Sequence, residues 1–427
     1  MINEAALFRR ITWRLIPFLF LLYIVAYIDR INVGFAKLQL RAAFGVDEGA
    51  FSAMYGFGAG IFFLGYFLFE VPSNLILERV GARVWIARIM VVWGFVSAGM
   101  MFVRTPAQFY AMRFLLGLAE AGFFPGILFY LTCWYPSALR ARTVAFFATA
   151  SALAGVVGSP LSGALMKLDG WLGLGGWQWL FVLEGLPAVA LGAVTLAYLP
   201  RDPASAPWLA QDEKAWLAER LRQDAVATGR HERHRLVQAL SSGRLWLLCL
   251  LYFLLNVGGY GFEMWIPSIL KDLSQAGFGL LGLLNAVPYL AAAVAMVLAG
   301  RSSDRTGERR GHVAGAALAG AAGFWISASA GQPVLAMAAL VLAFAGLKAT
   351  MGPFWALGTA FLSGTAAAGG IALINSVGNL GGFVGPQVVG WLVRETGNPR
   401  LALGVLGGVL ALMGLLALAV RAPHRER

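Results

Sequence analysis

The chain has 427 residues, of which 59% are hydrophobic and 13% are charged, and its formal net charge is +12. A soluble domain carries roughly 25% charged residues, so this composition excludes an ordinary soluble protein and indicates a polytopic membrane protein. The positive net charge alone would fit a nucleic-acid-binding protein, and the placement of the basic residues decides that question.

Twelve apolar stretches are long enough to cross a bilayer, which takes roughly 20 helical residues. They lie near 14–36, 52–75, 84–103, 107–135, 142–167, 177–199, 244–270, 278–300, 312–331, 334–362, 366–393 and 400–421. The first stretch follows three arginines as a signal peptide would, but it is long and contains Asp29 and Arg30, so we expect an uncleaved span. The sequence predicts an all-α membrane protein with 12 transmembrane helices.

Lys and Arg residues are distributed unequally between alternate loops. With the amino terminus in the cytosol, 23 of the 33 fall in cytosolic segments and 7 in outer loops, and Arg30, Arg113 and Lys348 lie within spans. Cytosolic loops of membrane proteins are enriched in these residues. We therefore expect both termini to be cytosolic, and the basic balance needs no nucleic acid.

The two halves of the chain repeat. Residues 78–83 (ERVGAR) and 304–309 (DRTGER) follow the second and eighth stretches at an offset of 226 residues, and the same offset relates Gly155 to Gly381 and Pro160 to Pro386. We predict a six-helix half over 1–199, a linker over 200–243 and a second six-helix half over 244–427. Parallel six-helix repeats are typical of transporters whose halves rock around a site at the middle of the membrane.

Within the predicted linker, Trp208, Leu209, Trp216, Leu217 and Leu221 recur at helical spacing among charged residues. This pattern fits an amphipathic helix lying along the inner membrane surface. A plain solvated tether fits it equally well.

Four charged residues in apolar stretches are the main candidate site. Asp29 and Arg30 lie in the first stretch, and Arg113 and Glu120 lie in the fourth, seven residues apart and so on nearly the same helical face. Charges in a span are costly and mark functional sites. We expect the four groups to share one cavity, where moving an arginine toward or away from a carboxylate would unload or load a proton. The alternative is a static ionic contact, although buried ion pairs often add little stability.

The loop after the eighth stretch, 300–310 (GRSSDRTGERR), resembles the loop motif G-x-x-x-D-R-x-G-x-R-R of the major facilitator superfamily. The first-half copy departs from it, with Asn74 for the leading glycine and Glu78 for the aspartate. An acid at a helix end that faces basic residues can latch one side of the protein. The predicted gating residues are Glu78, Arg79, Arg83, Asp304, Arg305 and Arg309; the alternative is that the arginines only set topology.

Within that superfamily, the chain resembles the anion:cation symporter family. The resemblance covers nearly the whole chain and is carried by 27–32 (YIDRIN), 69–74 (FEVPSN), Arg113, Glu120 and 369–386. Similar bacterial permeases take up tartrate, phthalate or hydroxyphenylacetate with protons across the inner membrane. The resemblance implies Asp29 and Glu120 as proton-titrating acids, Arg30 as the substrate-carboxylate ligand, Arg113 as their charge partner, and Tyr66 and Asn379 as polar groups lining the site.

Further polar residues in the spans have weaker assignments. Lys348 could supply a second positive charge for a diacid or could pair locally, and Trp355 and Asn375 could line the pocket. Ser151 stands near a position where sugar-acid carriers of the family have glutamine, which favours a less hydroxylated or aromatic acid.

Three other acids also lie within spans. Glu263 could face the cavity or lie at a helix end, Glu70 fits gating or capping, and Glu184 fits a structural role.

The sequence predicts a transporter and no enzyme. The histidines have no metal spacing among acids and no nucleotide-binding motif occurs, so we expect no cofactor beyond protons as the coupling ion. We expect the partners to be a small organic carboxylate and the bilayer, and the protein to function as a monomer. Two alternatives remain: an exchanger or exporter of the same fold, suggested by the glycines and proline over 155–163, and a membrane sensor, for which we see no soluble signalling domain.

Overall fold

The computed structural model describes residues 2–136, 139, 147, 149–227, 242–361 and 365–420, and within these ranges the chain is helical with no strand. The helices of the first half are α1 (Glu4–Ile31), α2 (Val33–Phe44), α3 (Glu48–Val80), α4 (Ala82–Gly99), α5 (Pro106–Glu120), α6 (Phe123–Thr132), α8 (Ala150–Leu165) and α9 (Gly176–Tyr198). The helices that follow are α10 (Gln211–Ala227), α12 (Gly243–Glu263), α13 (Ile266–Ser274), α14 (Phe278–Thr306), α15 (Arg310–Ser329), α16 (Pro333–Ala349), α17 (Met351–Phe361), α18 (Thr365–Thr396) and α19 (Arg400–Ala419).

This architecture confirms the predicted all-α membrane fold. Ten helical runs of the described residues are long and apolar enough to cross a membrane, and each coincides with a predicted span. The other two predicted spans are α15 and α18, which are rich in glycine and alanine; α15 packs on α16 and α19, and α18 packs on α12 and α3. The start of the predicted fifth span at 142, linker residues 228–241 and the terminal residues 421–427 lie outside the described residues.

Several predicted spans are broken helices. α1 and α2 join at Asn32, α5 and α6 join at Gly122, and α16 and α17 join at Thr350. Gly122 has a φ of 87°, a left-handed conformation that glycine adopts at little cost. Its break follows directly after Glu120, the last residue of α5, so the carboxylate lies where the helix ends.

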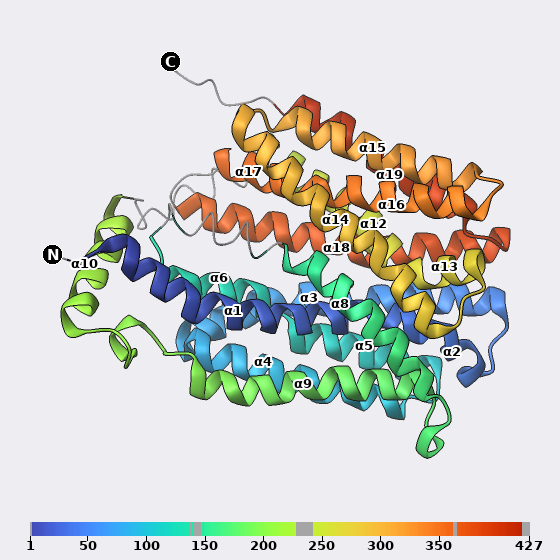
Figure 1. Ribbon diagram of the computed structural model, residues 1–427, viewed down its shortest axis with the longest axis horizontal. Coiled ribbons are helices and arrows are strands. Elements are labelled where there is room, and N and C mark those ends of the chain that lie inside the picture. The colour runs from blue at the N-terminus through green and yellow to red at the C-terminus, as the bar shows by residue number, and fades with distance from the viewer. Residues whose placement is uncertain are drawn as a thin grey trace.

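The two halves lie side by side with their long helices along the same axis (Figure 1). The principal contacts between them join α3 to α18 and α8 to α14. Glycines allow the close approach: a Cβ on Gly60 would lie 2.5 Å from the carbonyl oxygen of Phe383, and one on Gly163 would lie 2.5 Å from that of Phe278. Small residues let membrane helices pack backbone against backbone in this way.

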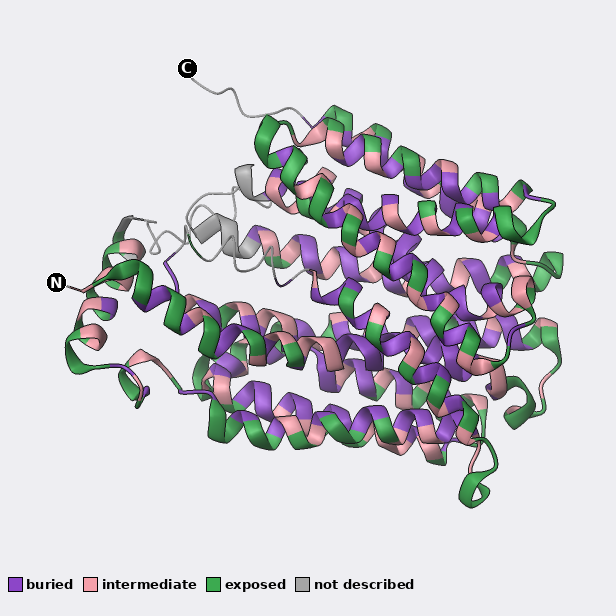
Figure 2. Cartoon of the chain, viewed as in Figure 1, coloured by how far each residue is buried: buried purple, intermediate pink, exposed green. Residues whose placement is uncertain are grey.

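Buried residues face the interior of the bundle, and the outward faces are exposed (Figure 2). Many of the exposed side chains are large and apolar, among them Leu283, Leu290 and Leu298 on α14. An apolar outer face suits lipid, because hydrocarbon offers no hydrogen bonds to polar groups.

The linker helix α10 packs on the amino-terminal end of α1 (Figure 1). Trp216 meets Phe8 edge to face at 6.2 Å between ring centroids, Leu217 is fully buried, and Arg10 forms an ion pair with Glu213. The backbone N–H of Ala210 and the Arg10 side chain hold the pKa of Glu213 below its ordinary value. The apolar side of α10 therefore contacts protein at the end of the bundle that carries the amino terminus.

Candidate functional site

A small cavity lies between the two halves at the middle of the bundle. Its volume is about 70 Å³, room for a few waters, since each needs roughly 10–15 Å³. Both halves line it with hydroxyl, amide and charged side chains. The polar or aromatic lining residues are Tyr23, Tyr27, Arg30, Tyr66, Phe124, Ser151, Tyr252, Asn256, Tyr260, Glu263, Lys348, Trp355, Asn375 and Asn379.

The first charged pair at the cavity is Arg30 with Glu120. Arg30 lies in the last turn of α1, and its Nη2 forms an ion pair with the Glu120 carboxylate. Its Nη1 donates a hydrogen bond to the Tyr260 hydroxyl of the second half at 3.1 Å. Among the described residues, Arg30 Nε and Glu120 Oε2 have no hydrogen-bond partner. The guanidinium can therefore accept a further anion, and the carboxylate can accept a proton.

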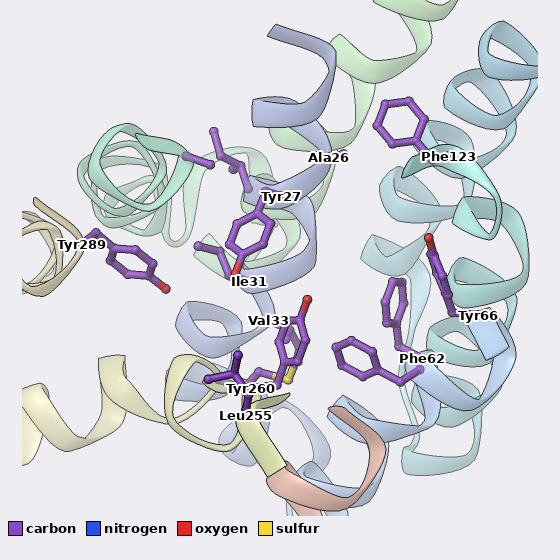
Figure 3. Close-up of a cluster of buried hydrophobic side chains, with 14 of the residues drawn as sticks. Ala26, Tyr27, Ile31, Val33, Phe62, Tyr66, Phe123, Leu255, Tyr260 and Tyr289 are labelled. Carbon is purple, nitrogen blue, oxygen red and sulfur yellow. The ribbon is translucent and has the colours of Figure 1, made fainter. Parts of the chain in front are cut away.

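A second charged pair lies across the same cavity, on the second half. Lys348 Nζ is 2.9 Å from Glu263 Oε1, and Lys348 and Glu263 are 5% and 2% exposed. Tyr27, from α1 of the first half, donates its hydroxyl to both Glu263 oxygens at 2.9 Å and accepts from Lys348 at 2.9 Å. The hydroxyls of Tyr27 and Tyr260 both point into the space between α1 and α12 (Figure 3).

Asp29 and Arg113 are buried away from this cavity. Asp29 accepts hydrogen bonds from Trp93 Nε1 at 2.6 Å, from Ser97 Oγ and from Asn32 Nδ2 at 3.3 Å. Arg113 donates to the carbonyl oxygens of Gly58 at 3.4 Å and Ala59 at 3.3 Å. Neither forms an ion pair within the described part of the chain.

Of the four charges that we expected in one cavity, the structure thus brings only Arg30 and Glu120 into contact. The reason lies in helix geometry. Consecutive residues of a helix point about 100° apart. Arg30 faces the cavity and Asp29 faces α4, which carries Trp93 and Ser97.

Tyr66, Trp355, Asn375, Asn379 and Ser151 all line the cavity. The Arg30 guanidinium lies 5.6 Å from the centroid of the Tyr66 ring, close enough for a cation–π contact.

Two of the other acids have partners of different kinds. Glu70 accepts hydrogen bonds from Asn375 at 2.8 Å and Ser376 at 2.6 Å, which ties α3 to α18 across the two halves. Glu184 accepts from Ser162 at 2.7 Å within the first half.

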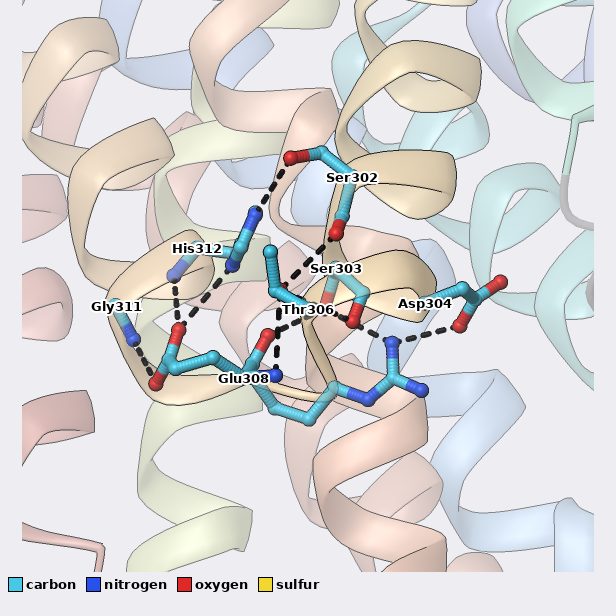
Figure 4. Close-up of polar contacts among 8 residues, drawn as sticks. Ser302, Ser303, Asp304, Thr306, Glu308, Gly311 and His312 are labelled. Atoms are coloured by element: carbon cyan, nitrogen blue, oxygen red, sulfur yellow. Dashed lines mark hydrogen bonds and ion pairs between the residues drawn. The ribbon is translucent and has the colours of Figure 1, made fainter.

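The predicted gating loop is held together by its own residues (Figure 4). Arg309 pairs with Asp304 at 2.7 Å and donates to Ser303 at 2.9 Å, while Glu308 accepts from the backbone N–H of Gly311 at 2.8 Å at the start of α15. Arg305 is exposed. Within the described residues, the ion-pair partner of Asp304 therefore lies in the same loop and not on a neighbouring helix.

The first-half copy of this loop makes fewer contacts. Arg83 donates to the carbonyl oxygen of Leu196 on α9, and Glu78 and Arg79 are exposed.

Sequence reasoning gave no role to six polar or aromatic cavity residues, Tyr23, Tyr27, Phe124, Tyr252, Asn256 and Tyr260. A signal for three of them exists. Tyr27 is three residues before Arg30 on α1, and Asn256, Tyr260 and Glu263 follow each other at spacings of four and three on α12. Such spacings place side chains on one helical face.

Comparisons with known proteins agree with this architecture. The family model described as Major Facilitator Superfamily matches residues 19–386 and 274–427. A protein of Agrobacterium vitis named "Putative tartrate transporter" is 48% identical over 98% of this chain and 95% of its own length. A "Quinolone resistance transporter" of Acinetobacter baumannii is 42% identical over 97% of this chain and 94% of its own.

Solved structures share the fold. That of a D-xylose-proton symporter superposes with a TM-score of 0.77 at 16% sequence identity, covering 97% of this chain and 98% of the other. At this identity the likeness concerns the fold alone. The family match over most of the sequence and the 48% identity to a named transporter decide the classification: the chain is a transporter and belongs to the major facilitator superfamily.

Proposed function

We propose that this transporter takes up a small organic carboxylate together with protons by alternating access. The observation that carries the proposal is the ion pair between Arg30 and Glu120 beside the central cavity. A guanidinium is suited to bind a carboxylate through two parallel hydrogen bonds. The name of the Agrobacterium vitis relative refers to tartrate, a carboxylate, and supports the same substrate class.

Charge balance in the buried site supplies the coupling. Leaving one member of a buried ion pair without a partner costs roughly 3–5 kcal/mol. An incoming carboxylate that binds Arg30 through two parallel hydrogen bonds, at the unpaired Nε and at Nη2, displaces Glu120 from Nη2, and Glu120 then avoids an unpaired charge by taking a proton. Both the empty state and the loaded state are thereby neutral. Release follows when Glu120 loses its proton and pairs with Arg30 again.

Asp29 and Arg113 act from the first half in this proposal. Arg113 lies within electrostatic reach of both Asp29 and Glu120. We retain Asp29 as the second proton-titrating acid, although it contacts only neutral donors. Arg113 then tunes both acids without touching the substrate.

The size of the cavity supports alternating access. Ligand pockets typically have volumes of roughly 300–1,000 Å³, and this cavity has about 70 Å³. A substrate therefore enters only when the halves separate. We propose a location in a bacterial inner membrane, with both termini cytosolic and the monomer as the functional unit.

The test is uptake into proteoliposomes under an imposed pH gradient, acid outside. We expect the wild type to accumulate the substrate acid. Glu120→Gln should lose gradient-driven accumulation at least about tenfold and keep exchange of labelled for unlabelled substrate, since a permanently neutral side chain leaves Arg30 available.

Glu395→Gln makes the same change on an exposed acid of α18 and should behave as wild type. Uptake by the wild type that ignores the pH gradient would contradict proton coupling. Undiminished accumulation by Glu120→Gln would remove Glu120 from the proton path.

A second candidate is export or exchange on the same fold. The name of the Acinetobacter baumannii relative, a quinolone resistance transporter, favours export, as does the run of small residues with Pro160 in α8. The direction of flux separates the two: a symporter accumulates the acid on the side with lower proton concentration, and a proton-driven exporter moves its substrate against the proton flow.

A further inference from the structure

We propose that Lys348 and Glu263 form a second anion-binding subsite, so that the preferred substrate is a dicarboxylate that binds both halves at once. The inference rests on the proposed function and names its substrate class. Arg30 of α1 would hold one carboxylate and Lys348 of α16 would hold the other.

The geometry of the second pair resembles that of the first. Each cavity cation is matched by one carboxylate of its own half, Arg30 by Glu120 and Lys348 by Glu263. Each pair also receives one tyrosine hydroxyl from the opposite half: Tyr260 contacts Arg30 at 3.1 Å, and Tyr27 contacts Lys348 at 2.9 Å. Two cations, each neutralised by a carboxylate of its own half, therefore face one cavity from opposite sides.

A static ionic strut between the halves is the alternative reading of this cluster. A buried ion pair gives little stability compared with apolar residues of similar size, so apolar packing would serve a strut better. Glu263 and Lys348 also both lie on the second half, and in the part of the chain that the structure describes their one hydrogen-bond partner from the first half is the Tyr27 hydroxyl. The charges therefore do not themselves join the halves, and both line the cavity.

Charge balance at the two cations then predicts one proton on Glu120 and one on Glu263 for each bound dianion. When the second carboxylate reaches Lys348, Glu263 loses its ion pair and takes a proton, as Glu120 does at Arg30. The two negative charges of the substrate are then balanced by these two protons, and a proton on Asp29 is separate from this balance. The Tyr27 hydroxyl, which donates to Glu263 in the empty state, remains within reach of Glu263 and can accept the new proton's hydrogen bond.

A bound dicarboxylate would also favour closure of the protein. With one end on α1 and the other on α16, it connects the halves by two charge-assisted contacts. A monocarboxylate satisfies only one half and leaves Lys348 paired with Glu263. The second subsite thus determines specificity without excluding weak binding of monocarboxylates.

The experiment compares acids that differ by one carboxyl group. Binding to the purified full-length protein is followed by tryptophan fluorescence, because Trp355 lines the cavity. The matched pairs are tartrate and threonate, succinate and butyrate, and phthalate and benzoate. We expect the wild type to bind the dicarboxylate of its best-bound pair at least about tenfold more tightly, the usual effect of one hydrogen-bonded charge contact.

The double variant Lys348→Gln/Glu263→Gln keeps the shape of the pair and its net charge of zero. It should lose the tenfold preference and bind the monocarboxylate within about threefold of wild type. Its thermal unfolding is measured in parallel to show that it is folded. Lys167→Gln, on an exposed lysine just past the end of α8, is the matched control and should keep the preference.

Two outcomes overturn the inference. Equal affinities within each pair of acids would show that Lys348 does not bind substrate, and so would a preference that persists in the folded double variant. If uptake still follows the pH gradient in that case, the proposed function stands without the second subsite. Failure of the wild type to bind any of the acids, together with uptake that ignores the pH gradient, contradicts the proposed function itself.

Discussion

Asp29 and Arg30 are neighbours in the chain with different surroundings. Among the described residues, Arg30 has one charged partner, Glu120, and an unpaired N–H, whereas Asp29 is fully buried and accepts hydrogen bonds from Trp93 and Ser97 on α4. A charge that has neutral partners on a neighbouring helix holds that helix in place. A charge that has one ionic partner and a cavity beside it can exchange that partner.

We therefore expect Asp29→Asn and Glu120→Gln to differ in effect. The side-chain amide introduced by Asp29→Asn would direct a donor at the Trp93 N–H or the Ser97 hydroxyl, so the free energy of unfolding should fall by about 1–3 kcal/mol. Gradient-driven accumulation should decrease without vanishing, because Asp29 makes no direct contact with Arg30, the proposed substrate ligand. Thermal unfolding and proteoliposome uptake measure the two effects.

Trp93→Phe provides the matched comparison, since it removes one donor to Asp29 and leaves the carboxylate in place. It should lower stability and keep the pH dependence of uptake. If Asp29→Asn abolished accumulation as fully as Glu120→Gln while remaining as stable as wild type, Asp29 would be a primary proton carrier.

At this scale, the sequence predicted which spans contain buried charges and not how those side chains are oriented. Arg30 and Glu120 follow from the cost of charge in lipid, and that argument is equally true of Asp29. The rotation of α1 that separates Asp29 from Arg30 depends on its packing against α8 and α9. The Tyr27 contact with Glu263 joins residues 236 positions apart, which no local pattern can reveal.

Among the elements, the pair α3 and α5 positions Glu120. Gly117 of α5 lies directly against the backbone carbonyl of Phe62 on α3, too close for any Cβ. Three residues further along α5, Glu120 reaches Arg30. The close approach of the two helices therefore determines the position of the carboxylate.

Gly117→Ala should separate α3 from α5 and displace Glu120. Overpacking of this kind costs about 1–3 kcal/mol of stability, and we expect a lower unfolding temperature together with weaker pH coupling of uptake. The control is Gly404→Ala on α19, where a Cβ would meet nothing within 4 Å. That change should be neutral or stabilising, because alanine favours helix by about 1 kcal/mol over glycine.

Unchanged stability and coupling in Gly117→Ala would mean that α5 is not positioned by this contact.

Hydropathy predicted the spans themselves and missed their interruptions. The sequence has 53 glycines, and only the packed structure shows that Gly122 takes a left-handed conformation and ends α5 at the charged pair.

In the whole molecule, the halves are in close contact at the end of the bundle opposite the amino terminus, where α2 and α13 lie (Figure 1). Tyr55 donates to the carbonyl oxygen of Met264 at 2.7 Å. A Cβ on Gly34 would lie 3.1 Å from that same oxygen and 3.2 Å from Cγ of Pro267. This end is predicted to face outward, so entry of substrate from outside requires α2 and α13 to separate.

A reversible cross-link tests that requirement. In a background without Cys133 and Cys249, the pair Gly34→Cys and Pro267→Cys brings the Cβ atoms of the two cysteines near the Cβ–Cβ distance of a disulfide, roughly 3.5–4.5 Å. Pro267 is the second residue of α13, in the first turn, where a backbone N–H has no partner within the helix, so its replacement should be tolerated. We expect oxidation to stop uptake at least about tenfold and a reductant to restore it, with each single-cysteine variant unaffected by oxidation.

The cross-link separates alternating access from any route that leaves the halves in contact. A cavity of about 70 Å³ cannot admit a carboxylic acid from outside while α2 and α13 are joined, since the charged side chains that line it in the described structure lie between the halves. Substrate binding from the opposite end should persist in the cross-linked protein, because that end is untouched. Full uptake after complete cross-linking would show that the substrate does not enter between α2 and α13. Separation of the halves could then not expose the charged pairs to each side of the membrane in turn.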